Sequence, residues 1–283
     1  MSPRSPFFRD KSALITGASS GIGRELALQL GAANAHLTLT ARRKELLYTV
    51  AQQISATGHE APLVVQADVA RDGELEHAVS EVLRVYHKLD IVIANAGFGV
   101  AGPLNRLSLN DYRRQFETNV FGVLRTIYTV LPALEKSRGH LAIVGSVSGW
   151  AASPGSSAYS MSKFALRALA NAITPELKLS GIKVTLITPG YVDSDFRRVN
   201  NQNMIEPGVQ DSAPRWLVMP TDQACRQMLR AIARGQREVI ITRHGKLLVA
   251  VERFAPWVLR AVGNMMVKKG KMPRQRNWER ESE

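Results

Sequence analysis

The stretch ALITGASSGIG, residues 13–23, joins a short apolar run to a glycine-rich turn. A strand that leads through such a turn into a helix is the first half of a βαβ unit. Glycines let the backbone turn tightly and approach an anion, and the helix expected from Arg24 offers that anion free N–H groups. The spacing G-x-x-x-G-x-G departs from the common dinucleotide fingerprint, so the turn taken alone leaves a pure packing role open.

Six further β-rich runs follow this stretch, and segments with apolar residues at helical spacing, such as Leu75, Val79 and Val82, separate them. The alternation predicts an α/β fold with a single doubly wound (Rossmann) parallel seven-stranded sheet and helices on both faces. The expected strands are Ala13–Thr16, Leu37–Thr40, Leu63–Gln66, Ile91–Asn95, Leu141–Val144, Val184–Thr188 and Glu238–Thr242. In such a sheet ligands bind beyond the carboxyl ends of the strands.

Local signals refine this outline at several positions. Asn110 and Asp111 are predicted to cap a helix that runs through residues 120–129, and Ser156 or Ser157 to start another. Pro175 is expected to kink or shorten that second helix. Residues 191–216 have the composition of a long irregular connection, which is typical of a lid.

Composition places the chain among globular proteins, since 45% of its 283 residues are hydrophobic and 22% are charged. A single cysteine, Cys225, excludes an intramolecular disulfide and a cysteine-based metal cluster, and no metal site is assigned. No apolar run has the length of a signal peptide or a membrane span, so a cytoplasmic location is expected. We divide the chain into a dinucleotide-binding domain, residues 1–242, and a basic amphipathic extension, residues 243–283.

The end of the second expected strand bears on the choice of nucleotide. An NAD enzyme places an acid there for the ribose 2′-hydroxyl, but residues 40–43 read Thr-Ala-Arg-Arg. Arg42, helped by Arg43 or Arg24, is therefore predicted to pair with a 2′-phosphate, which favours NADP(H). The alternative is that Arg42 is an ordinary surface arginine.

A catalytic set is predicted after the fifth strand and on the helix that follows. Ser146 follows that strand, and Tyr159 and Lys163 lie four residues apart, so that they project from one helix face. A nearby ammonium favours the phenolate, and bringing the tyrosine pKa from near 10 to near 7 takes about 4 kcal/mol. Tyr159 could then exchange a proton with a substrate oxygen while Ser146 donates a hydrogen bond to it.

From about Lys11 to Thr242 the chain resembles the short-chain dehydrogenase/reductases. The resemblance rests on the joint occurrence in order of several motifs. They are Thr16–Gly23, Asp68, Asn95-Ala96-Gly97, Asn119, Ser146, Tyr159, Lys163, and Pro189-Gly190 with Val192 and Ser194.

The resemblance implies a Ser–Tyr–Lys catalytic set with Asn119 as a fourth member, whose backbone helps hold a water in a proton relay to Lys163. It also implies that Pro189–Val192 lies beside the nicotinamide, that Ser194 bonds the carboxamide where the family usually has threonine, and that the chain forms dimers or tetramers. The residues assigned to the cofactor are Gly17, Ser19, Ser20, Gly21, Ile22, Gly23, Arg42, Asp68, Val69, Asn95, Ala96, Gly97, Tyr159, Lys163, Pro189, Gly190, Val192 and Ser194.

Residues expected to face the substrate are mostly apolar, so a small apolar carbonyl or alcohol is the expected substrate. They are Phe98, Val147, Trp150, Tyr191 and Phe196. Several of them could equally be packing residues.

The extension is amphipathic and basic, since residues 243–283 hold ten Lys and Arg against four Glu in a chain of net charge +13. One hypothesis is peripheral contact with an anionic membrane. The simpler alternative, which we prefer at this point, is packing against the main domain or a partner subunit.

Two other functional classes, a serine hydrolase and a non-catalytic binding module, are alternatives to the oxidoreductase. Residues 17–21 also spell the G-x-S-x-G elbow of serine hydrolases, but that fold needs strands before the elbow, and few histidines follow. A non-catalytic dinucleotide-sensing or nucleic-acid-binding module would suit the net charge. Such a module would not need Ser146, Tyr159 and Lys163 together. Nucleic-acid binding also favours interleaved aromatic and basic residues, whereas here aromatic residues are only 6% and Lys and Arg are spread along the chain or gathered in the tail.

Overall fold

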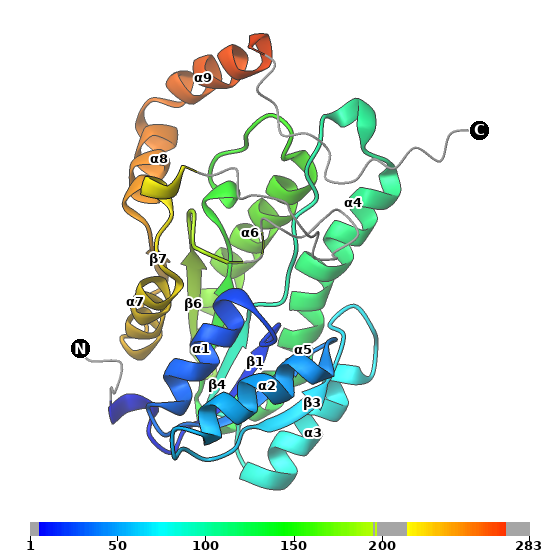
Figure 1. The fold of residues 1–283 in the computed structure, drawn as a ribbon, viewed down its shortest axis with the longest axis vertical. Helices are drawn as coiled ribbons and strands as arrows, with labels where there is room; N and C mark the ends of the chain where they lie inside the picture. Colours follow the sequence, from blue (N-terminus) through cyan, green and yellow to red (C-terminus); the bar gives the residue numbers. More distant parts are fainter. Residues whose placement is uncertain (1–5, 195, 197–213, 270–283) are drawn as a thin grey trace.

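The structure, a computed structural model, describes residues 6–194, 196 and 214–269. Its centre is one parallel sheet in the order β3-β2-β1-β4-β5-β6-β7, as Figure 1 shows in part. The strands are β1 Ser12–Thr16, β2 His36–Ala41, β3 Leu63–Gln66, β4 Ile91–Ala94, β5 His140–Val144, β6 Lys183–Thr188 and β7 Glu238–Ile240. The predicted fold class and all seven strands are confirmed.

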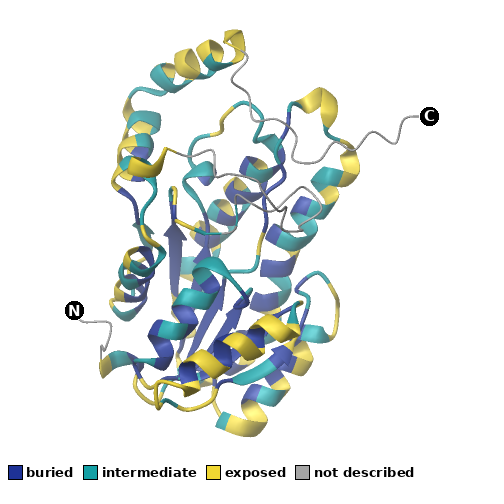
Figure 2. Cartoon of the chain, viewed as in Figure 1, coloured by how far each residue is buried: buried dark blue, intermediate teal, exposed yellow. Residues whose placement is uncertain are grey.

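Alternate residues of each strand supply two separate cores. In β1, Ala13 and Ile15 belong to one buried cluster and Leu14 to the other, because successive side chains of a strand point to opposite faces. Helices α1, α2 and α7 cover the first face, and α3, α5 and α6 the second. Figure 2 shows the sheet dark blue between these two helical layers.

The helices are mostly those that the apolar spacing predicts. They are α1 Gly21–Gly31, α2 Lys44–Ser55, α3 Glu74–Tyr86, α4 Leu109–Phe116, α5 Gly122–Ser137, α6 Ser157–Leu179, α7 Thr221–Ala233, α8 Arg243–Phe254 and α9 Pro256–Lys268.

One local prediction was wrong, and another was wrong in part. The cap of α4 is Ser108, which forms a capping box with Asp111, so Asn110 and Asp111 lie inside the first turn. Pro175 lies within α6, which continues to Leu179, so the helix is not shortened there; a kink at Pro175 stays a prediction. The start of α6 at Ser157 agrees with the sequence.

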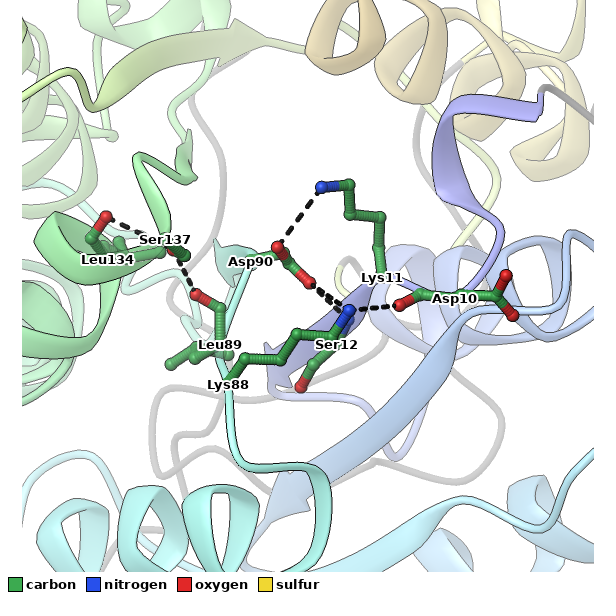
Figure 3. Close-up of polar contacts among 8 residues, drawn as sticks. All are labelled: Asp10, Lys11, Ser12, Lys88, Leu89, Asp90, Leu134 and Ser137. Atoms are coloured by element: carbon green, nitrogen blue, oxygen red, sulfur yellow. Dashed lines mark hydrogen bonds and ion pairs between the residues drawn. The ribbon is translucent and has the colours of Figure 1, made fainter.

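The amino ends of the central strands are tied together around Asp90, drawn in Figure 3. The Asp90 carboxylate accepts a hydrogen bond from Ser12 N–H at 3.0 Å and pairs with Lys11 and Lys88 at 3.3 and 3.6 Å. Ser137 Oγ donates to Leu89 O at 2.7 Å from α5. This end of the sheet is therefore fixed by polar contacts, and it lies opposite the end where ligands bind in such folds.

Much of the expected lid, residues 195 and 197–213, lies outside the described residues, as does the end of the extension from residue 270. Thr242 caps α8 by accepting from Gly245 N–H, so the first helix of the extension starts at Arg243. The division of the chain at residue 242 stays a prediction. Among the helices that the structure describes, none is both long and apolar enough to cross a bilayer.

Candidate active site

The glycine-rich turn after β1 is held against the end of β4 by the Asn95 side chain. Its Nδ2 donates to Thr16 O at 2.9 Å and to Gly17 O at 3.2 Å, while Thr16 Oγ1 accepts from Ala96 N–H. Gly17 has φ +68°, and a Cβ there would lie 2.8 Å from Ala96 Cα. This close approach explains why the sequence has glycine at 17 and a small residue at 96.

The glycine-rich turn leads directly into α1, whose amino end can bind an anion. Ser20 is the N-cap residue of α1 but makes no side-chain cap bond to the helix. Instead, Arg43 Nη2 donates to Ser19 Oγ at 3.1 Å and to Ser20 Oγ at 2.9 Å. The first N–H groups of the helix, a positive dipole end and a guanidinium thus converge, which is the donor set that a pyrophosphate or phosphate requires.

Two arginines, Arg42 and Arg43, follow each other at the end of β2, and it is the Arg43 side chain that contacts the glycine-rich turn. Arg42 is exposed, and the one contact described for it is its carbonyl accepting from Gln66 at 2.8 Å. Arg24 Nη2 donates to Gln53 at 2.9 Å. Arg43 was expected only as a helper, because sequence spacing cannot tell which of two adjacent side chains turns toward the loop.

The residues after β3 take part in local structure. Asp68 Oδ1 accepts from Ala70 N–H at 3.0 Å, so one carboxylate oxygen closes a turn. The neighbouring Val69 is buried against the start of α5, where a Cβ on Gly122 would lie 2.6 Å from its Cγ2. Their assignment to the cofactor stays a prediction.

Asn119 links the turn after β4 to the catalytic helix. It is fully buried in a π-helical turn, Glu117–Phe121, between α4 and α5. Its side chain accepts from Phe98 N–H at 3.1 Å, donates to Phe98 O at 3.0 Å and donates to Ser162 Oγ on α6 at 3.2 Å. A wide turn of this kind is frequent at functional sites, and here it holds the backbone beside Gly97.

Ser146, Tyr159 and Lys163 meet beyond the carboxyl end of β5. Ser146 Oγ is hydrogen-bonded to the Tyr159 hydroxyl and also accepts from Ser148 N–H at 3.1 Å. The Lys163 ammonium lies 5.8 Å from the centre of the Tyr159 ring and donates to Val144 O at 2.8 Å. The structure therefore brings together the three side chains that the sequence places 13 and four residues apart.

The expected lowering of the Tyr159 pKa is not found in the free protein. Burial raises the pKa of Tyr159 to about 12, against the opposing hydrogen bond from Ser146, and burial lowers the pKa of Lys163 to about 8. The reason is that both groups are withdrawn from water and the ammonium is directed to a carbonyl. At neutral pH the site therefore holds a neutral phenol beside a charged ammonium.

The Pro189–Val192 segment is fixed by a residue that sequence reasoning missed, His244. Its Nε2 accepts from Tyr191 N–H at 2.9 Å and lies 3.1 Å from Thr242 Oγ1, and its ring stacks on the Tyr191 ring at 5.3 Å. A Cβ on Gly190 would collide with both Thr242 and His244. Pro189 O accepts from Val147 N–H at 2.9 Å, so the segment is clamped from β5 and from the start of α8.

The other residues predicted for this segment lie at its far end. Val192 is buried and pairs with Met219, and a Cβ on Gly21 would lie 3.2 Å from Ser194 Cβ. Ser194 is thereby brought to the amino end of α1.

The residues predicted to face a substrate divide into two groups. Phe196 lies 5.4 Å from the Tyr159 ring, and Tyr191, on the clamped segment, is 44% exposed. Phe98 is buried in a small cluster with Val100 and Ala158.

Trp150 and Val147 make structural contacts. The indole of Trp150 donates to Glu238 at 2.9 Å, and its ring lies 3.2 Å beneath the Arg167 guanidinium. Val147 packs where α8 begins, since a Cβ on Gly245 would lie 2.8 Å from its Cγ1. A direct role in substrate binding for these residues stays a prediction.

Comparison with known proteins agrees with this geometry. The profile of the short chain dehydrogenase family matches residues 11–205. Dehydrogenase/reductase SDR family member 7B of Bos taurus is 31% identical over 242 residues, which cover 83% of this chain and 74% of that protein. An uncharacterized oxidoreductase of Staphylococcus aureus is 33% identical over 207 residues, covering 70% and 88% of the two chains.

Solved structures give the same fold. An alcohol dehydrogenase of the archaeon Thermococcus sibiricus, complexed with 5-hydroxy-NADP, superposes with a TM-score of 0.72 at 26% identity, covering 83% of this chain and 97% of that one. A 3-ketoacyl-(acyl-carrier-protein) reductase of Brucella melitensis, complexed with NADH, has a TM-score of 0.72 at 22% identity, covering 83% and 98%.

These relatives are oxidoreductases, and the family uses nicotinamide dinucleotides. The turn after β1 fits such a cofactor, because its helix end, its guanidinium and its glycine backbone suit a pyrophosphate. The family profile matches this chain, and its serine, tyrosine and lysine side chains meet in one site. The chain therefore belongs to the short-chain dehydrogenase family.

Proposed function

We propose that this protein is an NADP(H)-dependent oxidoreductase that interconverts a carbonyl and an alcohol, with Tyr159 as the general acid and base. The observation that carries the proposal is the hydrogen-bonded pair Ser146–Tyr159 with the Lys163 ammonium buried behind it. The reduced cofactor, when bound, supplies the hydride. Every other step falls to side chains of this chain.

Ser146 orients the substrate, because its hydroxyl can donate to a carbonyl oxygen beside Tyr159. As that oxygen gains negative charge, the Tyr159 hydroxyl gives it a proton. The raised pKa keeps the phenol protonated at neutral pH, so the free protein is prepared for reduction. Lys163, charged below its pKa of about 8, then stabilises the tyrosinate that forms.

The preference for NADP(H) is proposed from the arginines at the end of β2. Arg43 already reaches the turn that would hold the pyrophosphate, and Arg42 is exposed next to it. No acid stands at the end of β2, residues 40–43, to accept the ribose 2′-hydroxyl of NAD(H). A 2′-phosphate would meet two guanidinium groups instead.

The test starts with the binding of NADPH and NADH and continues with turnover. Cofactor oxidation is followed against apolar ketones, aldehydes and acyl thioesters, for the wild type and for Tyr159→Phe. Tighter binding of NADPH, together with turnover that the phenylalanine variant loses by a factor of 10² or more, supports the proposal. Binding without turnover on any substrate points to the non-catalytic dinucleotide-sensing alternative, and binding of neither cofactor refutes both.

We propose an apolar carbonyl or alcohol as the substrate. Phe196 lies against the Tyr159 ring, and the Tyr191 ring on the Pro189–Val192 segment is partly exposed, which favours an apolar molecule over a charged one. A cytoplasmic location stays a prediction from the sequence.

A homodimer or homotetramer is proposed from the exposed apolar side chains on α5, α6 and the turn before α5. Phe121 and Tyr128 lie seven residues apart, and Met161 and Phe164 lie three apart, so each pair shares one helix face. Large exposed apolar side chains gathered on neighbouring helices are typical of interfaces. Light scattering on the wild type and on a Tyr128→Arg, Met161→Arg variant tests this: a smaller mass for the variant is expected, and equal masses would contradict it.

A further inference from the structure

The two helices of the extension stand apart from the sheet and its helical layers. In Figure 1, α8 and α9 project together beyond the rest of the fold, coloured orange to red. Helix α9 has no buried residue, whereas α8 buries Gly245 and Val249 near its start. Packing of the extension against the main domain is therefore close at the first turns of α8 and looser along α9.

Helix α9 is apolar on its outer side as well as on its inner side. Leu259, Gly263 and Met266 share one half-buried face, and Gly263 lies near Pro154 of the main domain. The opposite side carries Trp257, 68% exposed, and Met265, 50% exposed, which lie about 80° apart around the helix axis. A helix that rests on a domain normally turns polar residues outward, whereas within the described part of the chain this apolar outer face is left uncovered.

Helix α8 repeats the pattern. Leu247 and Phe254, seven residues apart on one face, are 66% and 80% exposed. Arg243, Lys246 and Arg253 are exposed on the same helix. Large apolar side chains thus alternate with cations along both helices.

The charge of this region identifies the kind of partner. Residues 243–269 contain six Lys and Arg and one acidic residue, Glu252, and α9 contains no acidic residue at all. Arg260 and Lys268 flank Trp257 on its exposed face, at three and eleven residues from it. The cores of protein interfaces are depleted in lysine, whereas a face with tryptophan, aliphatic side chains and cations suits the headgroup region of an anionic bilayer.

We propose that the outer face of α8 and α9, formed by Leu247, Phe254, Trp257, Val262 and Met265 with their neighbouring cations, binds the surface of an anionic phospholipid bilayer. The helices lie in the interface without crossing it. Helix α8 begins at Arg243, next to the His244 that holds Tyr191, so docking would present the substrate side of the active site to the bilayer. This last consequence rests on the proposed function, but the binding itself does not.

The experiment is co-sedimentation of the full chain with phosphatidylcholine vesicles, with and without phosphatidylserine. Wild-type protein is expected to bind the anionic vesicles and to release them at high salt. Arg260→Gln with Lys268→Gln should lower the partition coefficient about 30-fold, because each cation near such a surface contributes about fivefold. Trp257→Ser with Met265→Ser should lower it by roughly tenfold or more.

The matched control is Leu179→Ser, which removes an apolar side chain that is 91% exposed on α6. It should bind as the wild type does. Absence of binding to anionic vesicles, or an equal loss in the control, overturns the proposal. The proposal is also overturned if, without vesicles, the Trp257→Ser, Met265→Ser variant has a different oligomeric mass from the wild type. That result would mean that this face joins two copies of the chain. Sedimentation needs no turnover, so its failure leaves the proposed oxidoreductase activity to its own test.

Discussion

Raising the pH through the pKa of Lys163 should switch off carbonyl reduction while Tyr159 stays protonated. The ammonium is buried, and burial lowers its pKa to about 8, four units below the pKa of about 12 for Tyr159. For one proton, the charged fraction is about one half at pH 8 and about a tenth at pH 9. If the charge on Lys163 is needed to stabilise the tyrosinate, kcat/KM should fall about tenfold from pH 7 to pH 9.

The assay is kcat/KM for NADPH-dependent reduction of the best substrate, which reports groups of the free enzyme. Lys163→Arg is the matched variant, because a guanidinium stays charged over this range. Its activity is expected to be lower but level from pH 7 to pH 9. Circular dichroism over the same range checks that the fold is intact. A wild-type profile that stays level to pH 10, or the same fall in Lys163→Arg, would refute the reasoning.

Three further outcomes are expected. Arg43→Met should weaken NADPH binding about 10- to 100-fold more than NADH binding, since contacts to the pyrophosphate are lost for both nucleotides but charge-assisted hydrogen bonds to the 2′-phosphate are lost for NADPH alone; equal losses for both nucleotides in titrations would show that Arg43 serves only the turn and the pyrophosphate. His244→Phe keeps a ring against Tyr191 but removes the acceptor for its N–H, so kcat/KM should fall about fivefold, while His244→Gln restores part of it; identical kinetics for the two variants would contradict that role. Burial lowers the pKa of His140 to about 4, so between pH 6.5 and pH 4 the ring is neutral in the folded state and protonated in the unfolded state. The free energy of unfolding therefore keeps its full value above pH 6.5 and decreases as the pH falls toward 4. Urea unfolding at pH 7 and pH 4.5 should show a loss of about 2.5 kcal/mol that His140→Phe reduces, and equal losses in both proteins would count against it.

The fold could be predicted from the sequence because its signals are local. Short β-rich runs, glycine turns and helical apolar spacing are all properties of a few adjacent residues, and the seven strands followed from them. The cap at Ser108 was missed, although its S-x-x-D pattern is equally local and was available in the sequence.

What the sequence could not provide depends on contacts between distant residues. Trp150 has the composition of a pocket residue, but its indole bonds Glu238, 88 residues away. His244 lies 53 residues after Tyr191, and no spacing rule connects them. The pKa of Tyr159 was predicted to fall because the neighbouring charge was counted without the burial that opposes it. Burial is a property of the assembled fold, so the direction of the Tyr159 pKa shift could not be obtained from the motif.

The bond between His244 and Tyr191 makes the extension part of the active site's framework. A chain cut before His244 would lose both the docking helices and the acceptor that fixes the segment beside the catalytic residues. Loss of turnover in such a truncated chain would therefore carry no information about membranes. Substitutions on the outer face of α9, far along the chain from residue 244, separate the two roles, whereas a natural variant that ends before His244 should lose both at once.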